Sequence, residues 1–279
     1  MILDEVKEWI LRRLIQPNTQ TILLVGPWVS GQAKFASDID IVVIAKKLLT
    51  SSQNEKMNFK NWTIDIWYND KNHMEMILQK KVENLSDIFQ KSYYLDFLLN
   101  CIVWYEKEPY IEKYIELTKN WKWNPEDKQF LRIQSKPPTK EWAKRAYEEN
   151  IKLLELAEKK FDEGKPISHR VKDYPELLIK VEKNEVEMLF KNILSSYKRL
   201  GIEREWLEMT YARKAIKDED WAKAFACIKG ILRFLIRKHV ASAPKELRNP
   251  SLWKMAEEQD LPLEIINLMK AVYKTSKTS

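Results

Sequence analysis

Strand-forming segments are confined to the first 125 residues of this 279-residue chain. There, short apolar runs alternate with segments whose apolar residues recur every three to four positions, the spacing of an amphipathic helix. Beyond Pro125 the strand pattern is absent and only helical periodicity remains. This change predicts an α+β fold class, with a small mixed-sheet domain over residues 1–125 followed by an all-α helical bundle domain over residues 126–279.

Periodicity, breaker residues and capping residues locate the expected elements. In the first domain we expect helices at about 2–15, 72–82, 85–99 and 109–120, and strands at about 21–25, 38–45, 62–68 and 101–106. In the second domain we expect helices at about 139–161, 175–199, 203–216, 219–240, 250–258 and 262–274.

The composition excludes several classes of protein. Hydrophobic residues make up 44% of the chain, which is enough to bury substantial cores and is unlike a disordered protein. The longest apolar runs are far shorter than the roughly 20 residues of a membrane-spanning helix, and the N-terminal segment lacks the pattern of a signal peptide. The two cysteines, Cys101 and Cys227, provide neither a disulfide framework nor a metal knuckle. We therefore expect a cytoplasmic, globular protein that does not associate with membranes.

The net charge is unevenly distributed along the chain. Residues 1–125 contain equal numbers of acidic and basic side chains, so the whole excess of +7 falls on residues 126–279. A basic face attracts phosphates through a sequence-independent electrostatic term, which fits a polyanionic partner such as RNA. Solvated, lysine-rich helix faces explain the same excess equally well.

The most informative stretch runs from the end of one apolar run to the start of the next. Gly26 closes the first run, and Asp38 and Asp40 open the second. Residues i and i+2 of a strand point to the same face, so the two carboxylates should project together. Adjacent carboxylates repel each other unless a cation joins them. Magnesium, which prefers hard oxygen ligands and often bridges carboxylates to substrate phosphates, is the cation that we expect.

A third carboxylate on a neighbouring strand would complete such a site. Asp65 is the candidate, because it interrupts the otherwise apolar and aromatic run from 62 to 68. Two metal ions held roughly 3.5–4 Å apart could then clamp both the attacking and the leaving oxygen of a phosphoryl transfer. Glu55 and Asp70 lie in polar, loop-like sequence, where we expect a carboxylate to be simply solvated.

Six residues together resemble the motif of the polymerase-beta-like nucleotidyltransferase superfamily, particularly its minimal archaeal and bacterial members and the aminoglycoside nucleotidyltransferases: Gly26, Gly31, Ser37, Asp38, Asp40 and Asp65. The resemblance covers about residues 20–106. It implies that Asp38, Asp40 and Asp65 are catalytic and bind Mg²⁺ or Mn²⁺. It also implies that an NTP, for which we expect ATP, binds at the turn formed by Gly26, Pro27, Ser30 and Ser37. The implied reaction moves an NMP from the NTP to an acceptor hydroxyl and releases pyrophosphate.

Pro27 departs from the family pattern, which has serine at this position. Proline offers neither a hydroxyl nor an N–H group to a phosphate, so one expected nucleotide contact is missing, and Ser30 is the candidate to replace it. The alternative is therefore a catalytically silent nucleotide- or RNA-binding protein, or a toxin–antitoxin component, that retains the fold. The acceptor of an active enzyme stays open between a small molecule, a protein and RNA.

One segment of the helical domain resembles another known module. Arg233 and His239 have the spacing found in ribonuclease members of the HEPN (higher-eukaryote-and-prokaryote nucleotide-binding) modules, which often accompany minimal nucleotidyltransferases. Basic residues near a helix C-terminus are also favoured by the helix dipole, and the apolar residues around them fit ordinary packing. We expect this domain to bind substrate or to form a homodimer.

Overall fold

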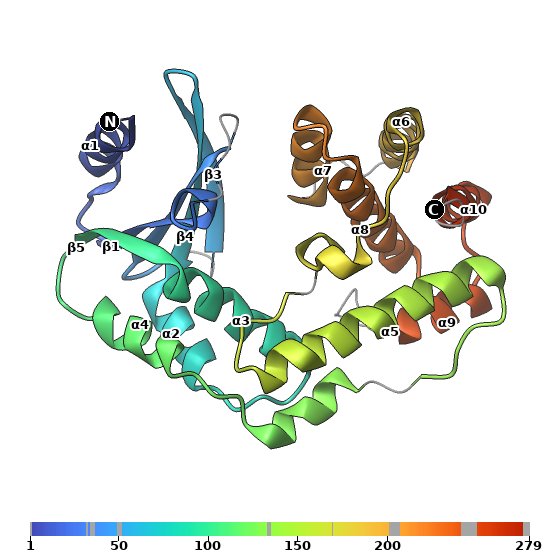
Figure 1. The fold of residues 1–279 in the computed structure, drawn as a ribbon, viewed down its shortest axis with the longest axis horizontal. Helices are drawn as coiled ribbons and strands as arrows, with labels where there is room; N and C mark the ends of the chain where they lie inside the picture. Colours follow the sequence, from blue (N-terminus) through green and yellow to red (C-terminus); the bar gives the residue numbers. More distant parts are fainter. Residues whose placement is uncertain are drawn as a thin grey trace. The chain divides into compact units, whose positions relative to one another are not determined.

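The structure, a computed structural model, describes residues 2–31, 33, 37–48, 52–132, 135–168, 170–200, 207–240 and 250–275. The chain divides into two compact units, Met1–Trp123 with Gly164–Pro166 and Asn124–Glu163 with Ile167–Ser279. Over the described ranges the first unit combines a five-stranded sheet with helices, and the second contains helices alone (Figure 1). The expected α+β fold class is therefore confirmed.

The sheet of the first unit has the strand order β3-β4-β2-β1-β5. Its strands are β1 (Thr19–Val25), β2 (Ile39–Ala45), β3 (Ser52–Phe59), β4 (Trp62–Asp70) and β5 (Cys101–Glu106). β2 and β4 run parallel, whereas the other neighbouring pairs are antiparallel, so the sheet is mixed. The three inner strands β4, β2 and β1 carry the apolar runs, because only inner strands have neighbours on both edges.

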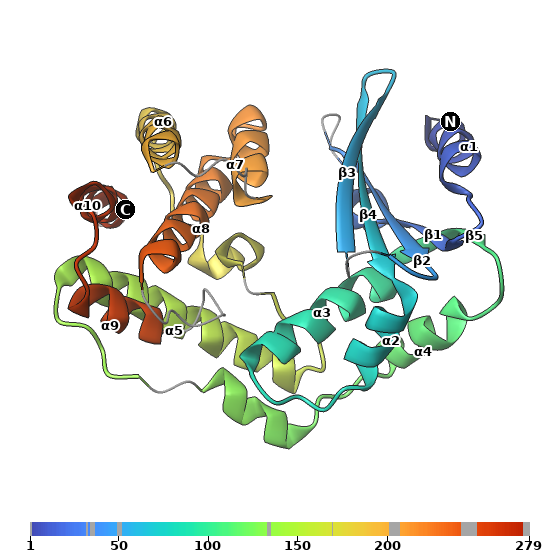
Figure 2. The same cartoon turned by 180° about the vertical axis from the view of Figure 1, so that it is seen from behind.

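Helices lie on both sides of this sheet: α1 (Ile2–Leu14), α2 (Lys71–Gln79), α3 (Leu85–Leu99) and α4 (Ile111–Lys119). α1 lies on one side, and α2, α3 and α4 lie on the other (Figures 1 and 2). Side chains of α1, including Val6 and Ile10, are fully buried against Ile39 and Ile41 of β2 and Ile64 of β4. One face of the inner strands is thereby fixed in the core, and the alternate residues must point to the opposite face.

The second unit is a bundle of α5 (Glu141–Asp162), α6 (Lys183–Arg199), α7 (Leu207–Lys217), α8 (Trp221–His239), α9 (Ser251–Glu258) and α10 (Leu263–Thr275). α8 is its most buried element and packs against α6, α7 and α10. Asp220 begins α8 by accepting a hydrogen bond from the backbone N–H of Lys223 (3.1 Å). No helix within the described residues is both long enough and apolar enough to cross a membrane.

Two expectations about the elements are wrong. The polar segment 52–59 was expected to be a loop and is strand β3, whose side chains are largely exposed because it pairs only with β4, at the edge of the sheet. The helix expected over 175–199 begins only at Lys183, because Pro175 starts a single 3-10 turn and the chain continues in extended conformation from Leu178. Residues 203–206 of another expected helix lie outside the described residues.

Candidate active site

Asp40 and Asp65 are direct neighbours on the two parallel strands of the sheet. In the register of β2 and β4, Asp40 pairs with Asp65, between the pairs Ile39–Ile64 and Ile41–Ile66. Since those isoleucines face α1, strand alternation directs both carboxylates to the opposite face of the sheet. Neighbouring strands are about 4.8 Å apart, so these two acids share one small area of that face.

Asp38 belongs to the same group through a shared cation. It lies immediately before β2, and its Oδ2 is 3.8 Å from Nζ of Lys56. The same ammonium lies 3.6 Å from Oδ2 of Asp65. The Asp65 side chain is only 7% exposed and that of Asp38 17%, so Lys56 neutralises charge where water is scarce.

Asn54 fixes the orientation of the Asp65 carboxylate. Its side-chain Nδ2 donates to Oδ1 of Asp65 (2.5 Å) and to the backbone carbonyl of Ile66 (3.2 Å). Asn54 and Lys56 are two residues apart on β3 and therefore share a face, and the register sets Lys56 opposite Asp65. The edge strand thus supplies two polar groups to the carboxylates.

Gly26 closes the opposite side of the site. Its φ of +75° lies in the left-handed region, which glycine adopts without strain. A Cβ at this position would overlap the Asp40 carboxylate and would lie 3.2 Å from its Cγ. The missing side chain at Gly26 therefore gives the Asp40 carboxylate its space, as well as allowing the turn.

Trp28 ties the Gly26 turn to the segment before β2. Its indole Nε1 donates to the backbone carbonyl of Asp38 (3.1 Å) and lies 3.4 Å from that of Ser37. The ring packs edge-on against Trp62, with 5.2 Å between ring centroids. These contacts make Trp28 a positioning residue for Asp38.

Pro27 and Ser30, which were also expected to bind nucleotide, belong to the same turn, whereas Ser37 lies just before β2. Gly26–Trp28 forms one turn of 3-10 helix with Pro27 in its first positions, where a missing N–H group costs no hydrogen bond. The backbone N–H groups of Val29 and Ser30 both donate to the Gly26 carbonyl (3.1 and 3.3 Å). The Ser30 hydroxyl is exposed and bonds back to the Pro27 carbonyl at 3.4 Å. Ser37 directly precedes Asp38 and is half-buried.

The carboxylates of the site are possible ligands of a divalent metal ion. As they stand, no three His, Cys, Asp or Glu side chains of the described residues form a group that could hold an ion. Magnesium, however, is commonly held by only one or two carboxylates together with substrate phosphates. The neighbouring acids Asp40 and Asp65, with the space that Gly26 leaves, fit that requirement. In this structure the Lys56 ammonium lies beside the Asp65 carboxylate.

Two acids set aside by the sequence analysis have structural partners. Glu55 accepts a hydrogen bond from the Tyr68 hydroxyl (3.0 Å), and burial, followed by this contact, raises the pKa of Tyr68 to about 12. Asp70 caps α2 by accepting from the backbone N–H of His73 (2.9 Å), and it also accepts from the N–H of Leu48 (2.9 Å). The expectation that Asp70 is simply solvated is therefore wrong.

Lys56 and Asn54 are the site residues that the sequence did not reveal. Both lie in the polar segment that was expected to be a loop, and neither belongs to a recognisable motif. One signal was present: a polar segment and the strand run 62–68 are separated only by Lys60 and Asn61, a spacing typical of a hairpin. Lys60 has the positive φ (53°) that such a turn requires.

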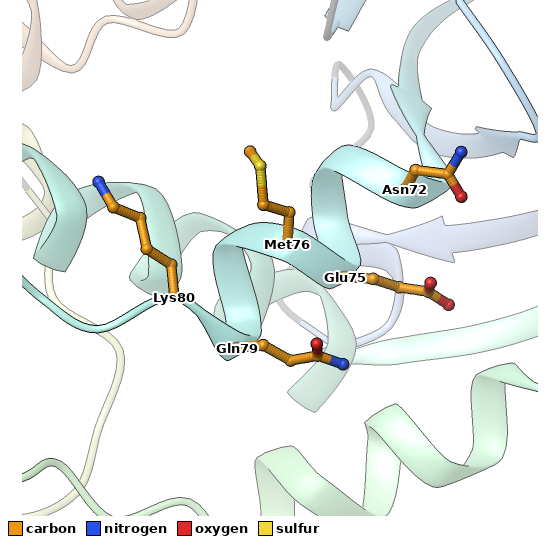
Figure 3. Close-up of a pocket in the computed structure, with 5 residues that line it drawn as sticks. All are labelled: Asn72, Glu75, Met76, Gln79 and Lys80. Carbon is orange, nitrogen blue, oxygen red and sulfur yellow. The ribbon is translucent and has the colours of Figure 1, made fainter.

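A shallow pocket elsewhere in the first unit does not involve the carboxylates. It is lined by α2 and the residue after it, with Asn72, Glu75, Met76, Gln79 and Lys80 (Figure 3). α2 begins after Asp70, five residues beyond Asp65 along β4, a separation of roughly 16 Å for an extended strand. We therefore assign it no part in the candidate site.

Arg233, the first residue of the HEPN-like pair, is fully buried in the helical unit. Its guanidinium forms an ion pair with Glu149 of α5, which also pairs with Lys229, and it lies 5.6 Å from the centre of the Trp253 ring. Burial alone would raise the pKa of Glu149, but the charges of Lys229 and Arg233 outweigh it and hold that pKa below its usual 4.5. These contacts favour a structural role for Arg233.

His239 is separated from Arg233 by its position on the helix. Six residues along an α-helix rotate the side chain by roughly 240°, so the two do not share a face. The half-buried His239 ring has Nδ1 at 2.8 Å from the Leu235 carbonyl, one turn back along α8. The spacing that resembles the ribonuclease pair therefore does not bring these two side chains together.

Among solved structures, this chain is similar to a nucleotidyltransferase-like protein. A nucleotidyltransferase-like protein from Exiguobacterium sibiricum matches 98% of this chain and 78% of its own, with a TM-score of 0.33 and 11% identity. No protein-family model matches the chain, and no curated protein does. The chain is thus similar to a nucleotidyltransferase-like protein only weakly.

Proposed function

We propose that this protein is a metal-dependent nucleotidyltransferase whose catalytic carboxylates are Asp38, Asp40 and Asp65. The observation that carries the proposal is the register pair Asp40–Asp65, with Gly26 against the Asp40 carboxylate. Two neighbouring strands supply the acids, and the Gly26 turn leaves room for one of them. An acidic group beside a glycine turn suits phosphate chemistry, in which positioning and charge stabilisation do most of the work.

In the proposed reaction Asp40 and Asp65, joined by Asp38, would hold Mg²⁺ or Mn²⁺, and the Gly26 turn would receive the triphosphate. The bound ion would neutralise phosphate charge and help to align the reacting oxygens. The acceptor oxygen would form a bond to the α-phosphorus while the bond to the β-phosphate oxygen breaks, releasing pyrophosphate. One of the site carboxylates would accept the hydroxyl proton.

ATP is the co-substrate that we propose, and the acceptor is a hydroxyl of a small molecule, a protein or RNA. The second candidate function is a catalytically silent nucleotide- or RNA-binding protein. Pro27 favours it, because this residue has no N–H group or hydroxyl to offer a phosphate.

Pyrophosphate release separates these two functions. The purified protein is incubated with each NTP and a panel of hydroxyl acceptors, with Mg²⁺ or with EDTA, and pyrophosphate is measured by a coupled assay. We expect release that requires both the metal and an acceptor. Nucleotide binding by calorimetry without any release across the panel would favour the silent protein.

A further inference from the structure

Lys56 is a cation that already occupies one side of the proposed metal site. Its ammonium lies 3.6 Å from Asp65 and 3.8 Å from Asp38, and therefore bridges acids from two different segments. The antiparallel register of β3 and β4 sets Lys56 directly opposite Asp65, so the backbone itself delivers this side chain to the site. Asn54 holds the other Asp65 oxygen from the same face of β3.

The Lys56 side chain is also free enough to leave these contacts. It is 37% exposed, in contrast to Asp65 at 7%. A lysine ammonium sits on a flexible four-carbon stem and has three donors that can turn towards a new anion. Next to a nucleotide site, the strongest new anion is a triphosphate, which attracts lysine as a point charge.

We propose that Lys56 is a tethered counter-cation of the carboxylate group. Without metal it holds Asp38 and Asp65 together; when a divalent ion binds, Lys56 gives up the carboxylates and pairs with the phosphates of the nucleotide. Lys56 thus positions the carboxylates when no metal is bound, and it binds phosphate when metal and nucleotide are bound. This inference rests on the proposed function, because it takes the same three carboxylates as the metal ligands.

The two roles predict opposite effects of one substitution. Lys56→Met removes the competing charge, so Mn²⁺ alone should bind about fivefold more tightly, the size expected when two partly exposed ion pairs no longer compete. The same change removes a phosphate partner, so Mg²⁺–ATP should bind about tenfold more weakly. Free Mn²⁺ is measured by electron paramagnetic resonance and ATP binding by calorimetry.

Lys60→Met is the matched control. It removes a lysine from the same hairpin, but the Lys60 ammonium pairs with Glu5 and not with the site. The dissociation constants for Mn²⁺ and for Mg²⁺–ATP should both stay at the wild-type values in this variant. A thermal unfolding curve for each protein checks the fold. Lys56→Gln, which is also uncharged but remains polar, should repeat the result of Lys56→Met.

Failure of this inference can be told apart from failure of the proposed function. Unchanged or weaker Mn²⁺ binding in Lys56→Met, with Mn²⁺ binding lost in Asp40→Asn, would overturn the role of Lys56 and leave the metal site standing. Unchanged ATP binding in Lys56→Met would overturn the proposal that Lys56 pairs with the phosphates of the nucleotide. Wild-type protein that binds no Mn²⁺, with or without ATP, would overturn the proposed function and this inference together.

Discussion

Gly26 combines two constraints, a left-handed backbone and contact with the Asp40 carboxylate. Gly31 has almost the same conformation, with φ of +71°, but among the described residues nothing lies within 4 Å of the place where its Cβ would be. Alanine at either position should suffer the backbone strain, whereas alanine at Gly26 should also displace the Asp40 carboxylate. Comparing the two alanine variants therefore separates the effect of backbone strain in the turn from the effect of crowding the Asp40 carboxylate.

We predict that Gly31→Ala lowers the free energy of unfolding by about 1 kcal/mol, and that Gly26→Ala lowers it by more, about 2–3 kcal/mol. Only Gly26→Ala should also weaken Mn²⁺ binding, because its methyl group takes the space of Asp40. Urea denaturation and a metal titration on both variants measure these effects. Equal losses of stability with unchanged Mn²⁺ binding would show that Gly26 serves only the turn.

The proximity of Asp38, Asp40 and Asp65 could be predicted from the sequence, whereas the side chains that contact them could not. Asp38 and Asp40 stand out because a short motif beside an apolar run is a local signal, and Asp65 stands out because it interrupts a strand. Lys56 reaches Asp65 only through the register of a hairpin, which no local pattern in a polar edge strand fixes. In the sequence, nothing distinguishes Lys56 from any other surface lysine.

Among the elements, the apolar inner strands were foreseen and the polar edge strand was not. β1, β2 and β4 are buried on at least one face and therefore show apolar runs, whereas β3 is mostly exposed and reads as a loop. The helix start at Lys183 was missed for a different reason. Pro175 can begin a helix, and the sequence alone did not reveal that the chain extends again from Leu178 before α6 begins.

In the helical unit, α5 and α8 are joined by the buried group of Glu149, Lys229 and Arg233. Removing one partner of a buried ion pair leaves an uncompensated charge, so we predict that Arg233→Met lowers the free energy of unfolding by about 3–5 kcal/mol. Lys238→Met, at an exposed position of the same helix, should change it by less than about 0.5 kcal/mol. Urea denaturation measures both, and an Arg233→Met protein as stable as wild type would contradict the structural role.

The same group gives the helical unit a pH dependence. Because the pKa of Glu149 is lowered in the folded protein, its ion pairs contribute full stability above the usual value of 4.5. That contribution is lost as the pH falls below 4.5 and through the lowered pKa. In Arg233→Met the acid-induced loss should be smaller, since only Lys229 remains to stabilise the charged carboxylate.

At the scale of the whole molecule, the acids of the proposed site and the excess positive charge lie on different parts of the chain. The carboxylates belong to the first unit, and the net charge of +7 falls on residues 126–279. An anionic acceptor would be attracted to the basic second part of the chain. The fold class followed from the sequence, because the loss of strand patterns after residue 125 is a long-range signal that needs no motif.

Nucleotide transfer by the Asp40–Asp65 group can be measured with NTPs labelled at the α-phosphate. The labelled NTPs are incubated with the acceptor panel and with wild type, Asp40→Asn or Glu55→Gln. We predict Mg²⁺-dependent transfer of label by wild type and by Glu55→Gln, because the Glu55 carboxylate of the wild type contacts Tyr68 and not the site. Asp40→Asn should remain folded and lose about 100-fold or more in rate. Transfer by Asp40→Asn at the wild-type rate would contradict the assignment of the site.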